Sequence, residues 1–118
     1  MGLTIGSNRR EVICSVGWDW DYSFLSLDEE GYPISHSSQS LTMDVIDEKG
    51  AVIFTMSTDN GRVGLGDTTN QIVLTVPYSV VKDVPPGVYF GDLVQVVTPD
   101  SRKLVAGFTF RHGEATTE

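Results

Sequence analysis

The chain is poor in the residues that build disulfides, zinc sites and many catalytic centres. It has one cysteine, Cys14, and two histidines, His36 and His112, that lie far apart in the sequence. A single cysteine excludes a disulfide within the chain and fits a reducing compartment. A zinc site needs several cysteines or histidines at recognisable intervals, and none occur here. We therefore predict no metal site and no cofactor.

Positive charge is also scarce. Eight Lys and Arg residues face sixteen Asp and Glu residues, so the formal net charge is −8 and the sequence pI is about 4.5. Such a surface repels phosphate backbones and anionic lipid headgroups, and we expect neither nucleic acid nor membrane as a partner. No apolar run approaches the ~20 residues that cross a bilayer. The basic pair Arg9 and Arg10 follows a short mixed segment, the reverse of a signal peptide.

The 118 residues suit one folded domain. Apolar residues make up 40% and charged residues 20%, which is typical of a globular chain. There is no internal repeat, and no linker is long enough to divide the chain. We predict a flexible arm over residues 1–10, one domain over residues 11–112 and a disordered polar tail over residues 113–118.

Apolar and polar residues alternate with a period of two, and turn residues interrupt the pattern every eight to twelve positions. One short segment, residues 78–83, predicts a single helical turn. This pattern indicates an all-β antiparallel sandwich of about seven strands, with a small closed barrel as the structural alternative. Strands are predicted at residues 11–17, 20–27, 41–47, 51–57, 71–77, 88–97 and 103–111, with a shorter one at 62–65; the last long segment aligns Leu104, Ala106, Phe108 and Phe110 on one face.

A chain corner precedes one of the longest predicted strands. Pro85 and Pro86 cannot donate ladder hydrogen bonds, and Gly87 tolerates a positive φ, so the chain turns there. Tyr89 then stands at the start of the strand. A tyrosine in this place is typical of immunoglobulin-like and fibronectin-like sandwiches, where its ring is buried and its hydroxyl bonds to upstream backbone.

Trp18, Asp19, Trp20 and Asp21 form the most conspicuous candidate binding site. Two tryptophans around a carboxylate stack sugar rings or clasp peptides. Alternation along a strand gives a plainer interpretation, in which both tryptophans pack in the core and both aspartates face water. We favour the core interpretation and expect at least one tryptophan to be buried.

Other polar groups do not combine into a recognisable site. The acidic segment 28–30 could join Asp19 and Asp21 around Ca²⁺, but its spacing matches no EF-hand loop and a solvated turn fits better. No serine lies in a Gly-x-Ser-x-Gly elbow. Cys14 is expected to be a small buried hydrophobe, and the segment Gly64, Leu65 and Gly66 is expected to be a turn. The sequence thus predicts a protein that is not an enzyme.

Residues 12–111 resemble a family of small phage and prophage virion proteins of the immunoglobulin-like β-sandwich type. The resemblance covers most of the chain, and its motifs are structural. The chain departs from the family pattern at Gly91, where a second tyrosine is frequent, and in the serine-rich segment 35–40. The matching positions are Pro86, Gly87, Tyr89, Asp92, Leu93, Gly107, Phe108, Thr109 and Phe110.

This resemblance implies a non-enzymatic building block of the particle, made in the host cytoplasm and located in the virion. A tail or baseplate position is expected first, and a head decoration less often. Its partners would be other virion proteins or further copies of itself, reached through an edge strand, loops or the arm over residues 2–10. The alternative is a carbohydrate-binding or host-receptor-binding module that uses Trp18, Trp20 and nearby loops.

Overall fold

The computed structural model describes residues 9–14 and 17–113. In these residues the chain is almost entirely β, with one single-turn helix where the sequence predicts it. The elements are β1 (Arg9–Cys14), β2 (Trp20–Leu25), β3 (Leu41–Ile46), β4 (Val52–Ser57), β5 (Val63–Leu65), β6 (Gln71–Val76), α1 (Tyr78–Val81), β7 (Gly87–Thr98) and β8 (Ser101–His112).

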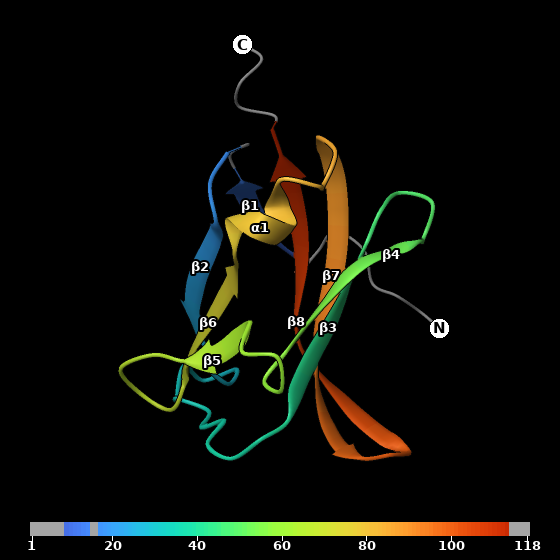
Figure 1. The fold of residues 1–118 in the computed structure, drawn as a ribbon. Coiled ribbons are helices and arrows are strands. Elements are labelled where there is room, and N and C mark those ends of the chain that lie inside the picture. The colour runs from blue at the N-terminus through green and yellow to red at the C-terminus, as the bar shows by residue number, and fades with distance from the viewer. Residues whose placement is uncertain (1–8, 15–16, 114–118) are drawn as a thin grey trace.

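The strands form two sheets that pack face to face (Figure 1). The larger sheet has the order β1-β8-β7-β3-β4, and the smaller has the order β2-β6-β5. The predicted all-β sandwich is therefore confirmed, while its assignment to the immunoglobulin-like type stays a prediction. One detail differs, because β1 runs parallel to β8. These strands are the first and last described in the chain, so no hairpin joins them and nothing imposes an antiparallel pairing.

The core lies between the sheets, and aromatic rings at its centre join them. Trp20 of β2 stacks on Phe110 of β8 with ring centroids 5.3 Å apart, and Phe24 meets Phe108 edge-on at 5.5 Å. Each pair places one ring from each sheet in contact, which contributes roughly 0.5–1.5 kcal/mol beyond the burial of area. The aliphatic part of the core follows the alternation along the strands. Leu41, Met43 and Val45 are buried on β3, and Ile72, Leu74 and Val76 are buried on β6.

The corner before β7 has the expected geometry. The ring of Tyr89 is 4% exposed, and its hydroxyl donates a hydrogen bond to the carbonyl of Pro85. Gly87 has a φ of +157°, in a region that side chains rarely adopt. The tyrosine thus ties the start of β7 to the loop that leads into it.

One predicted side-chain orientation is wrong at the far end of the β7–β8 hairpin. Leu104 was expected to point inward with Phe108, yet it is 68% exposed. The pairing shifts between Leu93–Ala106 and Val94–Leu104, so Val105 is an extra residue that inverts the alternation beyond it. The hairpin also extends past the smaller sheet, which therefore does not cover its end (Figure 1).

Strand β1 begins two residues before the predicted domain start at residue 11. Arg9 and Arg10 belong to β1, where they pair with Gly107 and Phe108 of β8. Both side chains have partners on the body of the domain, because Arg9 pairs with Asp92 and Arg10 lies over the ring of Phe24. At the other end, Gly113 donates its backbone N–H to Cys14 at 2.9 Å. The rest of the predicted arm and tail, residues 1–8 and 114–118, lies outside the described residues.

Candidate functional site

The two tryptophans of the predicted binding segment have opposite environments. Trp20 is 5% exposed in the core, whereas Trp18 is 70% exposed. The expectation that at least one would be buried is confirmed, but the expectation that both pack in the core is wrong for Trp18. Trp18 lies in the turn before β2 begins, so the strand alternation does not reach it.

Asp19 and Asp21 are both exposed, and Asp19 has a specific partner. Its Oδ1 accepts the backbone N–H of Tyr78, the first residue of α1, at 2.7 Å. Pro77, directly before the helix, makes no side-chain capping bond, so Asp19 supplies the acceptor from a distant part of the chain. Exposed Trp18 is thereby held in the same region as Tyr78, which is 47% exposed.

The indole of Trp20 is held by a buried histidine. Its Nε1–H donates to His112 Nδ1 at 3.3 Å, and His112 Nε2–H donates to the carbonyl of Val84 at 3.1 Å. Together the two partners define the neutral Nε2–H tautomer. Burial lowers the pKa of His112, and the bond to Val84 partly opposes that shift. His112 therefore joins β8 to β2 and to the loop after α1.

A second buried histidine stands between a serine and a glutamine. His36 Nε2 lies 2.8 Å from Ser26 Oγ, and His36 Nδ1 lies 2.7 Å from Gln39 Oε1. A hydroxyl, an imidazole and a third group that orients the ring make up the arrangement of nucleophilic catalysis. The sequence carries no signal for this cluster, because the three residues lie in a polar connection with no motif.

The surroundings of this cluster favour a structural role. Ser26 is 8% exposed and His36 is 5% exposed, so the hydroxyl does not face a substrate. The backbone N–H of Ser26 donates to Asn70, and that of His36 donates to Thr69, so neither is available to stabilise an oxyanion. These bonds anchor the connection after β2 to the turn before β6.

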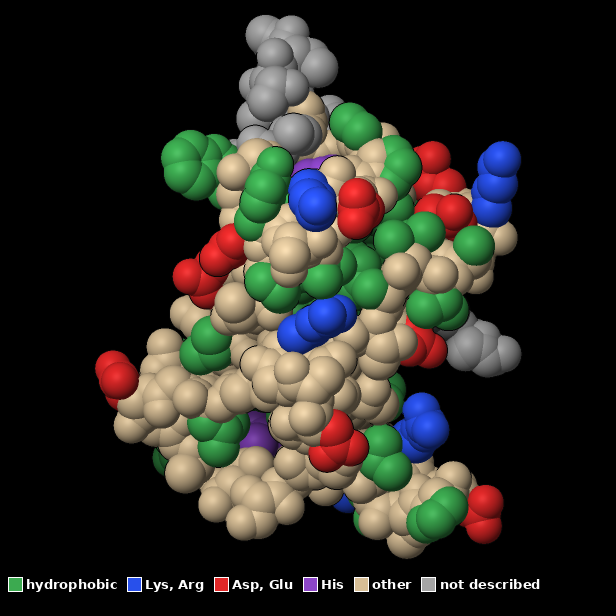
Figure 2. All heavy atoms as spheres, in the orientation of Figure 1, with side chains coloured by type: hydrophobic (Ala, Val, Ile, Leu, Met, Phe, Trp, Pro, Cys, Tyr) green, Lys and Arg blue, Asp and Glu red, His purple; other side chains and the backbone are tan. Residues whose placement is uncertain are grey.

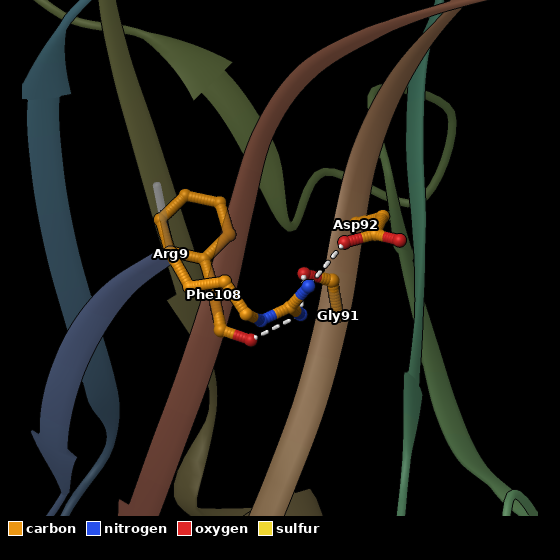
Figure 3. A network of polar contacts seen from close by, with 4 residues as sticks. All are labelled: Arg9, Gly91, Asp92 and Phe108. Atoms are coloured by element: carbon orange, nitrogen blue, oxygen red, sulfur yellow. Dashed lines mark hydrogen bonds and ion pairs between the residues drawn. The ribbon is translucent and has the colours of Figure 1, made fainter. Parts of the chain in front are cut away.

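Arg9 forms a network of polar contacts between strands of the larger sheet (Figure 3). Its guanidinium crosses β8 and reaches β7, where Nη1 lies 2.9 Å from Asp92 Oδ1. Nη2 donates to the carbonyls of Phe108 at 2.7 Å and Gly91 at 3.1 Å. A Cβ on Gly107 would lie 3.2 Å from both Nη1 and Asp92 Oδ1, so a glycine at this position leaves room for the ion pair.

A groove lies beside this ion pair on the outer face of the larger sheet. The pairing of Val45 with Gly91 and of Thr42 with Val94 places Asp44 opposite Asp92 on the neighbouring strand. Asp44 also accepts a hydrogen bond from the Thr55 hydroxyl at 2.7 Å. The groove has a volume of about 430 Å³ and is lined by Arg9, Thr42, Met43, Asp44, Ile46, Phe90, Gly91, Asp92, Val94 and Arg102.

Cys14 and the acidic turn over residues 28–30 have ordinary structural surroundings. Burial raises the pKa of the Cys14 thiol from 9.0 to about 12, so the reactive thiolate is rare at neutral pH. Within residues 9–14 and 17–113, no three His, Cys, Asp or Glu side chains come close enough to hold a metal ion. Asp28 instead accepts the backbone N–H groups of Glu30 and Tyr32 in an exposed turn.

Two general surface features bear on partners. On the face shown in Figure 2, Lys and Arg side chains are scattered among acidic and apolar ones and form no continuous basic patch. In the part of the chain that the structure describes, no helix has the length and apolar character to cross a membrane.

No protein-family model matches the chain, and no curated protein matches it. The candidate site therefore rests on the geometry of the chain itself, and the resemblance to phage virion proteins stays a prediction from the sequence.

Proposed function

We propose that this chain is a non-enzymatic assembly module of a phage virion, a tail or baseplate component that docks onto neighbouring virion proteins. The residues that carry the resemblance support this proposal through their roles. Tyr89 holds the corner, and Phe108 lies in the core. Asp92 forms the ion pair with Arg9, and Gly107 leaves room for that pair. A motif made of such positions specifies a scaffold, and a scaffold acts through its surface.

The observation that carries the proposal is the outer face of the larger sheet. It holds a groove with two carboxylates, two guanidinium groups and the Phe90 ring, beside a hairpin that extends past the smaller sheet (Figure 1). Paired charges around an apolar centre confer specificity on a protein–protein contact.

The edges of this sheet supply a second means of docking. The edge strands are β1 and β4, and each exposes one aliphatic residue, Ile13 at 57% and Val52 at 56%. An extended segment of a partner can add to such an edge through main-chain hydrogen bonds. Edge addition and face contact are compatible, because they use different groups of the same sheet.

Co-expression tests the proposal. The chain would be produced with each tail and baseplate protein encoded beside its gene, and complexes would be measured by size-exclusion chromatography with light scattering. We expect a defined complex with at least one of them. A chain that joins none of them, and is absent by mass spectrometry from purified particles, would contradict a virion role.

Glycan binding remains the second candidate because one observation favours it. Trp18 and Tyr78 are exposed aromatics held in one region by the Asp19 hydrogen bond. Trp20 takes no part, since it is buried. A glycan-array signal that disappears in Trp18→Ala and persists in Tyr32→Ala, another exposed aromatic, would favour this candidate over assembly.

A further inference from the structure

We infer that the outer face of the larger sheet binds a second copy of this chain, with Arg102 of each copy seated against Asp44 of the other. The inference rests on the proposed docking function and names one partner for it. Its two halves are the Asp44 carboxylate in the groove and the basic end of the β7–β8 hairpin, and both belong to the same face.

The acceptor half is a pair of carboxylates with unequal compensation. Asp92 has the Arg9 guanidinium at 2.9 Å, and the Arg9 side chain is 7% exposed, so this charge is satisfied within the chain. Asp44 accepts a hydrogen bond from the Thr55 hydroxyl and forms no ion pair with the described residues. Like charges opposite each other on neighbouring strands are destabilising. A cation brought to Asp44 would relieve that repulsion.

The donor half is the end of the β7–β8 hairpin. Every residue from 97 to 104 is exposed, and the segment contains Arg102 and Lys103 beside Asp100. Neither basic side chain forms an ion pair within residues 9–14 and 17–113. Val97 is 47% exposed and Leu104 is 68% exposed, so the same hairpin end also offers apolar surface. Basic groups flanked by exposed aliphatic groups are suited to a protein contact.

The location of both halves favours a twofold arrangement. Arg102 and Asp44 line one groove without pairing to each other. A twofold axis through the groove brings each Arg102 over the partner's carboxylate, so one operation makes two equivalent ion pairs. Phe90 and Ile46, which also line the groove, would supply apolar contact beside them. The net charge of −8 opposes association at long range, so these local pairs must provide the attraction.

A charge-swap experiment tests the inference in solution. Asp44→Arg and Arg102→Asp would be produced separately, and dimerisation of each would be measured by sedimentation velocity over a wide concentration range. We expect the full chain to dimerise. Each variant should dimerise at least about tenfold more weakly, since both of its ion pairs become repulsive. An equimolar mixture should restore association, because Arg102 of the first variant meets Asp44 of the second, and the introduced arginine meets the introduced aspartate.

The controls separate this surface from general effects of charge. Asp21→Arg makes the same change at an exposed aspartate of the smaller sheet and should leave dimerisation unchanged. Thermal melts show whether the charge reversals still fold. If they do not, the milder Asp44→Asn and Arg102→Gln replace them in the test, and each should weaken dimerisation. A monomeric wild-type chain, variants that associate like it, or a mixture that stays monomeric would each overturn the inference. None of these results bears on docking to another virion protein, which the co-expression test measures separately.

Discussion

Tyr89 shows how a single side chain can determine where a strand starts. The chain needs Pro85, Pro86 and Gly87 to turn, and the bond from the Tyr89 hydroxyl to the Pro85 carbonyl holds the turn against β7. Burial also raises the pKa of this phenol, so it remains a hydrogen-bond donor throughout the neutral range. Trp20 and His112 act in the same way across the core.

The Tyr89 corner predicts two graded losses of stability. Tyr89→Phe should lower the free energy of unfolding by about 1 kcal/mol through the lost hydrogen bond. Tyr89→Ala should lower it by ~3 kcal/mol or more, because it also leaves a cavity. Urea denaturation measures both, and Tyr32→Phe at an exposed tyrosine is the matched control. A Tyr89→Ala chain as stable as the parent would refute the structural role.

The two tryptophans should respond differently to the same change. Trp20→Ala should lower the free energy of unfolding by ~3–5 kcal/mol, because it leaves a cavity in the core and removes the hydrogen-bond donor to His112 Nδ1. Trp18→Ala should change it by about 0.5 kcal/mol or less, as expected of an exposed side chain. With Trp18→Phe and Trp20→Phe as single-tryptophan chains, iodide should quench Trp18 emission strongly and Trp20 emission weakly. Equal quenching would contradict the opposite environments.

His112 should make the stability depend on pH on the acidic side of neutrality. Burial holds its pKa below 6.5 in the folded chain, so at falling pH the unfolded chain takes up a proton before the folded chain does. Its contribution is therefore complete above about pH 6.5 and declines as the pH falls below that value. Measured by denaturation at several pH values, His112→Gln should show a shallower decline than the parent. Identical slopes would show that His112 does not contribute.

At the scale of elements, β1 belongs to the domain because of side chains as well as ladder hydrogen bonds. It is an edge strand, and edge strands open more readily than central ones. Arg9 binds Asp92 on β7, and Glu11 Oε2 accepts two hydrogen bonds from Arg111 on β8. The Arg9 contact bypasses the adjacent strand and joins β1 to the third strand of the sheet.

The Arg9 contact predicts a local effect on β1. Arg9→Met should lower the stability by about 2 kcal/mol, because it removes charge-assisted hydrogen bonds to Asp92 and to two carbonyls. Hydrogen exchange should show faster opening of residues 9–14 than of β3 or β7. Arg10→Met is the neighbouring control, since Arg10 lies over the Phe24 ring at 4.6 Å and forms no ion pair with the described residues. Unchanged exchange in β1 after Arg9→Met would contradict the anchoring role.

At the scale of the whole molecule, the two sheets have different roles. The smaller sheet closes the core over the inner face of the larger one, through Trp20 and Phe24. The other face of the larger sheet carries the groove. This sheet also has two edge strands and the hairpin that extends past the smaller sheet (Figure 1). Self-association and docking to other virion proteins are both proposed for the larger sheet. The charge-swap test measures the first, and the co-expression test measures the second.

Local patterns were sufficient to predict the class of fold and most of its strands. Alternation depends on neighbouring residues alone, so β3 and β6 could be recognised from their apolar residues. The corner at Tyr89 was also readable, because Pro, Pro, Gly and Tyr stand close together in the chain. The face of Leu104 was not, since one bulge residue inverts a pattern that is otherwise regular.

The tertiary structure alone decided the contacts between residues far apart in the chain. Arg9 with Asp92, Trp20 with His112, and Ser26 with His36 and Gln39 carry no spacing that a sequence pattern could detect. The parallel pairing of β1 with β8 and the groove at Asp44 are of the same kind. Secondary structure follows from local periodicity and turn chemistry, whereas a polar site depends on which distant side chains the sheet topology brings within hydrogen-bond reach.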